Sequence, residues 1–394
     1  MTEPTPVVAD IVPAECPPDR NTILMQGVFS MHTRGAPSAG CVRQALKDGY
    51  WDRTDVIELA DGSRRVRKRT KGATAPGPWG VGSLRREIQY LVTLPEGARA
   101  MFPPVLTAWD DESVSSPDVG YEMPYYDNHV DAGELSRRGA LAQEEIDVFQ
   151  DALADSVLGG LHEPVRPAEP MSAHVVSVVR QALAGLEAEP TLAALISAPS
   201  IDLNGAHVRG PRAAFDQIVR ETDALRSLDS GPCVRLHGDF FLENILWRPA
   251  GIRGTSEAPR LILVDPVSVA GATRGPPLFD LVKYESYAVG ELLALRSEWV
   301  DVAGFTSAND DSLARDYRFR IRWENPALRR FLALDWRTRF RRAFEAKYGP
   351  VDRRLARFLD GYFSVVMAVN TKGDQQRARL LKATTEFNAV LTGN

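Results

Sequence analysis

Two short apolar runs constrain the fold of this chain more than any other feature of its sequence. They are CVRLHGD, residues 233–239, and RLILVDPVSV, residues 260–269, and both interrupt a long stretch of helical patterns. Short apolar runs bounded by turn residues are typical of buried strands, so each is predicted to be a strand rather than a helix. Each run carries a carboxylate near its end, Asp239 in the first and Asp265 in the second. The fold therefore embeds strands in a helical unit and presents acidic side chains beside them.

The segment HGDFFLEN places Asp239 five residues before Asn244. This pattern suits a loop for phosphoryl transfer, because the aspartate can accept the proton of an attacking hydroxyl and the asparagine oxygen can bind Mg²⁺. Asp265 is the natural second metal ligand, since Mg²⁺ takes hard oxygen donors and only one or two protein carboxylates. The spacer between the runs is polar and rich in turn residues, which predicts a hairpin of 245–247 with 261–264 that brings Asn244 and Asp265 together.

Residues 23–130 have a β-rich character. The stretch 56–70 contains two alternating segments around Ala-Asp-Gly-Ser, which predicts a hairpin. A helix is expected from an N-cap at Ser83, with apolar residues following at helical spacing. Two strand-like pieces, 103–109 and 119–126, complete this unit.

From residue 131 the pattern becomes helical. The stretches 136–162, 174–189 and 212–228 are predicted to be amphipathic helices, and the chain from 278 onward is predicted to be helical again. The sequence therefore indicates a small β-rich unit, a short connection near 125–130, and a larger helical unit. A ligand cleft is common between two unequal lobes of this kind.

The β-rich unit contains a candidate ion pair. Lys68 follows Val66 by two residues, so both side chains lie on one face of the predicted strand. Glu87 lies between Leu84 and Leu91 on the apolar face of the predicted helix. A buried carboxylate is costly unless it is paired, and Lys68 is the expected partner, with the nearby Lys71 as a rival. A lysine and a helix glutamate so arranged can hold nucleotide phosphates.

Taken together, HGDFFLENIL, LILVDP and GPPLFDL resemble the aminoglycoside phosphotransferase and choline kinase-like family, distant relatives of protein kinases. The resemblance covers residues 237–281. It implies an α+β, bilobal protein kinase-like fold, with ATP or GTP as donor and Mg²⁺ as metal. It also implies that Asp239 is the catalytic base, that Asn244 and Asp265 hold Mg²⁺, and that Asp280 orders the catalytic loop. We expect lobes at 21–126, which binds nucleotide, and 127–394, which binds the acceptor.

Two further nucleotide contacts are expected. The small-residue loop at 35–41, with Ser38 and Gly40, can bring backbone N–H groups to phosphates, although it is not a GxGxxG pattern. Backbone groups of Glu122 and Met123 lie where an inter-lobe connection begins, so they can bond the nucleotide base. An ordinary loop and ordinary core packing explain both segments as well.

Composition excludes several classes of protein. The net charge is −5, which argues against nucleic acid or an anionic membrane as a partner. Three widely spaced cysteines fit a reducing cytoplasm, and no apolar run is long enough to span a bilayer. The proline-rich residues 1–20 predict a disordered leader. A GxSxG elbow and clustered zinc ligands are both absent from the sequence, which excludes the corresponding hydrolases and zinc enzymes.

These patterns predict a kinase that phosphorylates a hydroxyl of a small molecule, such as an antibiotic, sugar, cyclitol or nucleoside-like compound. Its role would lie in antibiotic resistance or metabolite biosynthesis. Residues 315–357 hold 14 basic and five acidic residues, which favours a neutral or anionic acceptor over a polycation. The alternative is a pseudokinase that binds nucleotide without transferring phosphate.

Overall fold

The computed structural model describes most of the chain from residue 35 to residue 393. The described ranges are 35–48, 52–71, 77–111, 118–139, 141–167, 169–221, 223–250, 259–267, 272–305 and 316–393. The expected leader, residues 1–20, lies outside them.

The N-terminal part is an antiparallel sheet of five strands in the order β1-β2-β3-β5-β4. The strands are β1 (Gly40–Asp48), β2 (Asp52–Leu59), β3 (Arg64–Thr70), β4 (Thr107–Asp111) and β5 (Asp118–Pro124). The predicted hairpin is present as β2 and β3. Its turn is closed by Asp61, whose carboxylate accepts the Ser63 N–H at 2.9 Å, and Gly62 supplies the left-handed conformation that the turn needs, with φ of 80°.

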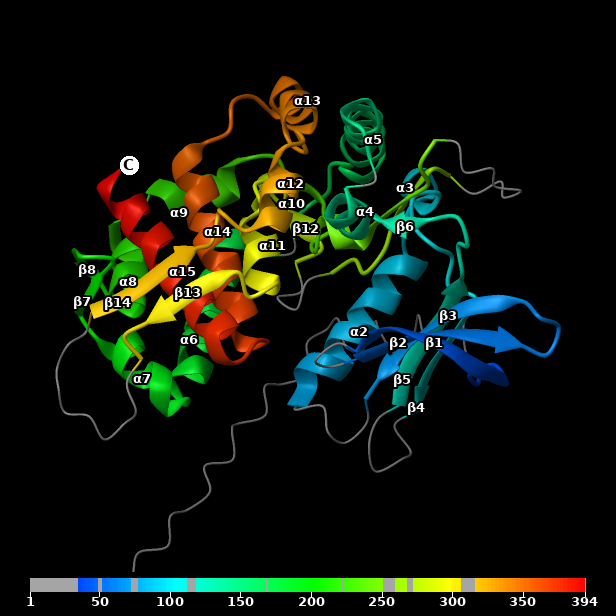
Figure 1. Ribbon diagram of the computed structural model, residues 1–394, viewed down its shortest axis with the longest axis horizontal. Helices are drawn as coiled ribbons and strands as arrows, with labels where there is room; N and C mark the ends of the chain where they lie inside the picture. The colour runs from blue at the N-terminus through cyan, green and yellow to red at the C-terminus, as the bar shows by residue number, and fades with distance from the viewer. Residues whose placement is uncertain are drawn as a thin grey trace, which may run out of the picture.

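One long helix, α2 (Gly77–Val92), covers one face of this sheet (Figure 1). Its buried side chains include Leu84, Ile88 and Leu91, at the spacing that the sequence indicated. The expected N-cap at Ser83 is wrong, because the helix begins six residues earlier. A proline at position 78 fits the first turn, where no intrahelical N–H bond is required. The short helix α3 (Glu96–Arg99) follows.

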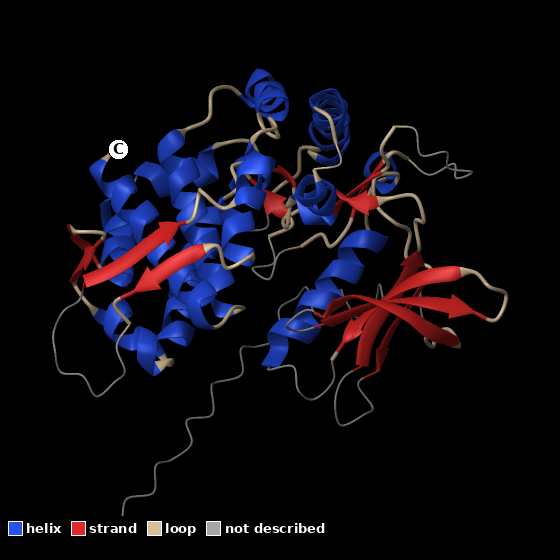
Figure 2. Cartoon of the chain, viewed as in Figure 1, coloured by secondary structure: helices blue, strands red, loops and turns tan. Residues whose placement is uncertain are grey.

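The remainder of the chain is mainly helical, and Figure 2 shows the contrast with the strand-rich N-terminal part. The helices are α4 (Ala132–Arg138), α5 (Gln143–Ser156), α6 (Met171–Glu187), α7 (Pro190–Ser197), α8 (Pro211–Glu221), α9 (Asp223–Ser230), α10 (Leu278–Ala288), α11 (Glu291–Arg296), α12 (Pro326–Leu332), α13 (Thr338–Tyr348), α14 (Arg353–Val369) and α15 (Gly373–Thr392). None of the helices within the described ranges is both long enough and apolar enough to cross a membrane.

Two expectations for this part are corrected. The stretch 136–162 is not one helix, because α4 ends at Gly139, whose φ of 62° is left-handed, and α5 begins after it; a π-helical turn, Val157–Leu161, follows α5. The region after 278 is not purely helical. It contains β13 (Val300–Ala303) and β14 (Asp316–Ile321), which join β7 (Ser200–Leu203) and β8 (Ala206–Arg209) in a four-stranded sheet.

Short strands surround the predicted catalytic segments. Both apolar runs contain a strand, β9 (Val234–Arg235) in the first and β11 (Leu261–Leu263) in the second. β9 pairs with β12 (Arg274–Gly275), whereas β11 pairs with β10 (Ile245–Trp247), which also pairs with β6 (Val130–Asp131). The architecture is thus α+β and bilobal, with a small β-rich N-terminal lobe and a larger helical C-terminal lobe. The predicted boundary at residue 126 falls in the connection between β5 and β6.

Candidate active site

The segment that follows β9 is held by Asp280, in the first turn of α10. Its two carboxylate oxygens accept the backbone N–H groups of His237 and Gly238 at 2.8 and 2.9 Å. His162 also contacts the carboxylate at 3.1 Å. Gly238 has φ of 81°, a conformation that glycine adopts without strain. Asp280 thereby fixes the backbone that presents Asp239.

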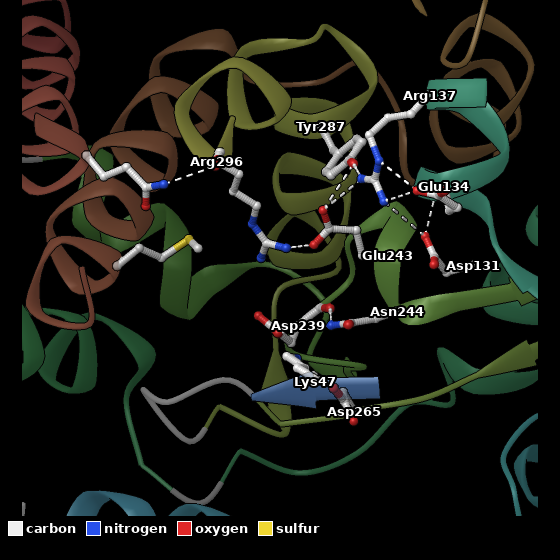
Figure 3. A network of polar contacts seen from close by, with 12 residues as sticks. Lys47, Asp131, Glu134, Arg137, Asp239, Glu243, Asn244, Asp265, Tyr287 and Arg296 are labelled. Carbon is white, nitrogen blue, oxygen red and sulfur yellow. Dashed lines mark hydrogen bonds and ion pairs between the residues drawn. The ribbon is translucent and has the colours of Figure 1, made fainter. Parts of the chain in front are cut away.

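Asp239 and Asn244 are in direct contact. The Asn244 side-chain amide donates to the Asp239 carboxylate at 3.0 Å and to its backbone carbonyl at 2.7 Å. A 3₁₀ turn, Leu242–Asn244, lies between β10 and Asp239 and folds the asparagine back. The two residues that the sequence singled out therefore lie side by side, as Figure 3 shows.

Lys283 is a functional candidate that the sequence reasoning missed. Its Nζ lies 2.7 Å from Oδ1 of Asp239, and its side chain is only 4% exposed. Burial raises the pKa of Asp239, but Lys283 and then Arg296 lower it, so the pKa lies below its usual value and the carboxyl is ionised at neutral pH. A signal was present, because a lysine on the apolar face of α10 requires an anionic partner.

The β10–β11 hairpin brings Asp265 to the same place. Ile245 pairs with Leu263, and the Val264 N–H donates to the Asn244 carbonyl at 2.9 Å, so the end of the hairpin lies beside Asn244 as predicted. The backbone here is strained, because Asp265 has φ of 52° and the β-branched Val267 has φ of 71°. Such strain is typical of functional sites.

The lysine and glutamate of the N-terminal lobe form the predicted ion pair. Lys68 Nζ lies 2.9 and 2.8 Å from the two Glu87 oxygens, and both side chains are buried. Tyr121 donates its hydroxyl to Glu87 at 2.7 Å. Burial raises the pKa of Glu87 to about 7 against the opposing effect of Lys68. Burial would lower the pKa of Lys68, but Asp265 and Glu87 raise it well above its usual value.

Asp265 connects the two lobes through two lysines. Its Oδ1 accepts from Lys68 at 3.0 Å and its Oδ2 from Lys47 at 2.9 Å. Burial raises the pKa of Asp265, but Lys47 and Lys68 lower it well below its usual value. Lys47, which the sequence did not identify, lies near the end of β1, and Asp52 at the start of β2 lies 3.4 Å from Lys68. The β1–β2 end of the sheet therefore lies over Asp265.

Ser38 and Glu122, both expected to contact nucleotide, bond to each other. Ser38 donates its N–H and its hydroxyl to the Glu122 carboxylate at 2.9 and 2.7 Å, and Arg65 and Arg67 pair with the same carboxylate. These β3 arginines alternate with Lys68, so this network lies on the opposite face of the sheet. The Glu122 carbonyl accepts the Leu106 N–H at 2.8 Å, which uses one of its two lone pairs.

Gly40 and Met123 both lie in strands of the N-terminal sheet, Gly40 in β1 and Met123 in β5. Gly40 begins β1, and a Cβ there would lie 2.9 Å from the Glu58 carbonyl oxygen, so close packing requires glycine. Of the predicted loop at 35–41, residues 35–39 precede β1 and residues 40–41 begin it, so this segment does not join β1 to β2. The β1–β2 connection, at 49–51, lies outside the described residues. Met123 is buried opposite Val66, on the same face of the sheet as Lys68.

The arginine-rich segment 315–357 pairs largely with nearby carboxylates. Arg339 contacts Asp147 and Asp151, and Arg341 contacts Glu285. The expected preference for a neutral or anionic acceptor therefore gains no support from this segment. Positive charge near Asp239 comes instead from Lys283 on α10, Arg296 on α11 and Lys47 on β1.

Comparison with models of known protein families finds no match, and comparison with curated proteins finds none. Similar solved structures include a glucosamine kinase in complex with glucosamine, ADP and inorganic phosphate, which is 15% identical with a TM-score of 0.35, the match covering 92% of this chain and 95% of that one. A macrolide 2'-phosphotransferase from Brachybacterium faecium is 14% identical with a TM-score of 0.36, covering 93% and 98%. A choline kinase from Cryptosporidium parvum Iowa II is 13% identical with a TM-score of 0.36, covering 94% of each chain. These structural neighbours are small-molecule kinases and phosphotransferases.

Proposed function

We propose that this protein is a Mg²⁺-dependent kinase that transfers the γ-phosphate of ATP or GTP to a hydroxyl group of a small molecule. One observation carries the proposal. Lys68, paired with Glu87 in the N-terminal lobe, reaches Asp265 at 3.0 Å, and Asp265 lies at the end of the hairpin that begins beside Asn244. Side chains distant in sequence thus meet at one place between the lobes.

The donor set fits a magnesium ion. Asn244 uses its Nδ2 to bond Asp239, which leaves Oδ1 as its metal-binding atom, and Asp265 supplies a carboxylate. The described residues contain no group of three or more His, Cys, Asp or Glu side chains that could hold a metal, which fits an ion that takes its other ligands from phosphate and water. When bound, Mg²⁺ would neutralise charge on the triphosphate. Lys68 would bind the phosphates, a role available to it once its contact with Asp265 is exchanged.

Asp239 would orient the acceptor and take its proton. The acceptor oxygen forms a bond to the γ-phosphorus while the bond from that phosphorus to the bridging oxygen breaks, and the nucleoside diphosphate leaves with the bonding electron pair. The hydroxyl proton passes to Asp239. Lys283 on Oδ1 and Asn244 on Oδ2 fix the carboxylate, so catalysis relies on placement and charge.

A pseudokinase is the alternative function, and turnover separates it from the proposal. The assay is Mg²⁺-dependent consumption of ATP and GTP across a panel of hydroxylated acceptors. We expect D239N to lose at least about 100-fold in turnover, as for loss of general-base catalysis, with nucleotide affinity nearly unchanged. D301N, the same change on an exposed strand, is the matched control. Turnover near wild type in D239N would remove Asp239 from this role, and nucleotide binding without turnover would favour the pseudokinase.

A further inference from the structure

Arg379 is a buried cation with no carboxylate partner among the described residues. The buried lysines Lys68, Lys283 and Lys382 each contact an acidic side chain within 3 Å. Arg379, on α15, is 2% exposed. In the part of the chain that the structure describes, its Nη1 donates to the Met367 sulfur at 3.6 Å, and its Nε has no partner. Burying a guanidinium without an anion is unfavourable, so an anionic group of a ligand at this position would be stabilising.

Arg379 lies toward the catalytic side of α15. Gln375, one turn earlier on the same face, donates to the Arg296 backbone carbonyl at 3.0 Å. Burial lowers the pKa of Arg379 to about 9, and repulsion by the charge of Arg296 adds to this effect. Arg296 in turn pairs with Glu243, which precedes Asn244 in the chain, and lies near Asp239 (Figure 3).

Arg379 also contacts helix α14, which in turn contacts Lys283 beside Asp239. Its contact Met367 lies one turn after Phe363, on the same helix face. The Phe363 ring centroid is 4.8 Å from Lys283 Nζ, and Lys283 contacts Asp239. Two independent routes, through α11 and through α14, therefore connect Arg379 to the catalytic carboxylate.

We propose that Arg379, with Arg296, forms an anion-binding subsite for the acceptor, so that the acceptor carries a carboxylate or phosphate besides the hydroxyl that is phosphorylated. This inference rests on the proposed kinase function. A guanidinium offers a planar fork of N–H donors that matches carboxylate and phosphate. Arg296 is partly neutralised by Glu243, whereas Arg379 has no such counter-charge and is the principal anion ligand.

The test compares R379M with wild type in two assays. Glucuronate, glucose 6-phosphate and glucose share ring hydroxyls and differ in the anionic group, so they separate carboxylate, phosphate and neutral acceptors. We expect phosphorylation of one anionic member with a KM at least about tenfold higher in R379M, the scale of a lost charged hydrogen bond, and partial recovery in R379K. R377M, a change on the same helix at an arginine paired with Asp374, is the control and should leave the KM unchanged.

Melting temperature provides a readout that needs no turnover. Because an unpaired buried charge is removed, R379M without ligand should melt higher by at least about 2 °C. The two anionic sugars, and inorganic phosphate as a small probe, should raise the melting temperature of wild type more than that of R379M. A lower melting temperature of ligand-free R379M, or equal responses of both proteins to anions, would overturn the subsite. If anions raise the melting temperature of wild type more than that of R379M but no acceptor in any panel is phosphorylated, the kinase proposal fails instead.

Discussion

Replacing Lys283 by methionine should leave the Asp239 carboxylate without its closest cation. Two unit charges 4 Å apart attract by about 4 kcal/mol at an effective dielectric constant of about 20, and the Lys283–Asp239 distance is shorter, at 2.7 Å. Desolvation cancels part of that attraction, and removing one partner of a buried pair costs about 3–5 kcal/mol. Because the Asp239 side chain keeps 28% of its exposure, we expect K283M to lose about 3 kcal/mol in the free energy of unfolding.

A double-mutant cycle measured by equilibrium denaturation tests this value. D239N alone should also be destabilised, because it leaves Lys283 buried without a counter-charge. The double variant K283M/D239N removes both charges and should lose much less than the sum of the single changes, which gives a coupling of about 2–3 kcal/mol. Additivity within about 0.5 kcal/mol would refute the reasoning.

Lys382 offers a matched control for this cycle. It is buried on α15 and pairs with Asp360 and Glu291. K382M therefore removes a buried, paired lysine whose partners are not those of Lys283. We expect K382M to be destabilised on a scale similar to K283M and to show no coupling to D239N. Coupling of K382M to D239N would mean that the cycle reports general destabilisation rather than a local ion pair.

Three further predictions concern the residues around the same site. K68M should weaken Mg²⁺–ATP binding at least tenfold, about 1.4 kcal/mol, measured by calorimetry; unchanged affinity would contradict its phosphate role. K47A should change the free energy of unfolding by less than about 1 kcal/mol, because the Lys47 side chain is 53% exposed, and a larger loss in denaturation would show that its contact with Asp265 is structural. Burial raises the pKa of Asp280 but His162 lowers it, and the net pKa lies below the ordinary 3.8. The stability that the Asp280 carboxylate contributes is therefore present above about pH 4 and is lost as the pH falls through the pKa of the folded state. D280N should accordingly be least stable relative to wild type near pH 7 and converge with it in acid, in pH-dependent denaturation; a constant difference would contradict this.

Features fixed by residues close in sequence were predictable. The β2–β3 hairpin depends on a local turn, and the β10–β11 hairpin depends on a turn-rich spacer between two apolar runs. Lys68 and Glu87 were identified because an ionisable group on an apolar face requires a partner. The same argument applies to Lys283, because a buried lysine on α10 also requires an anionic partner.

Features that depend on long-range pairing were not predictable. The alternation of Lys68 with Arg67 does not say which side of the sheet Ser38 and Glu122 occupy, because that depends on pairing with β5. The contact of Lys47 with Asp265 spans 218 positions and depends on how the lobes meet. β14 pairs in parallel with β7 across more than 100 residues, so its local pattern was insufficient to distinguish it from the surrounding helices.

The most direct test of the central claim is a crystal structure with Mg²⁺ and a non-hydrolysable ATP analogue. We predict a metal bound by oxygens of Asn244 and Asp265, with Lys68 contacting a phosphate and Asp239 facing the γ-phosphate. A nucleotide bound away from these four side chains, or a metal that contacts neither Asn244 nor Asp265, would contradict the account.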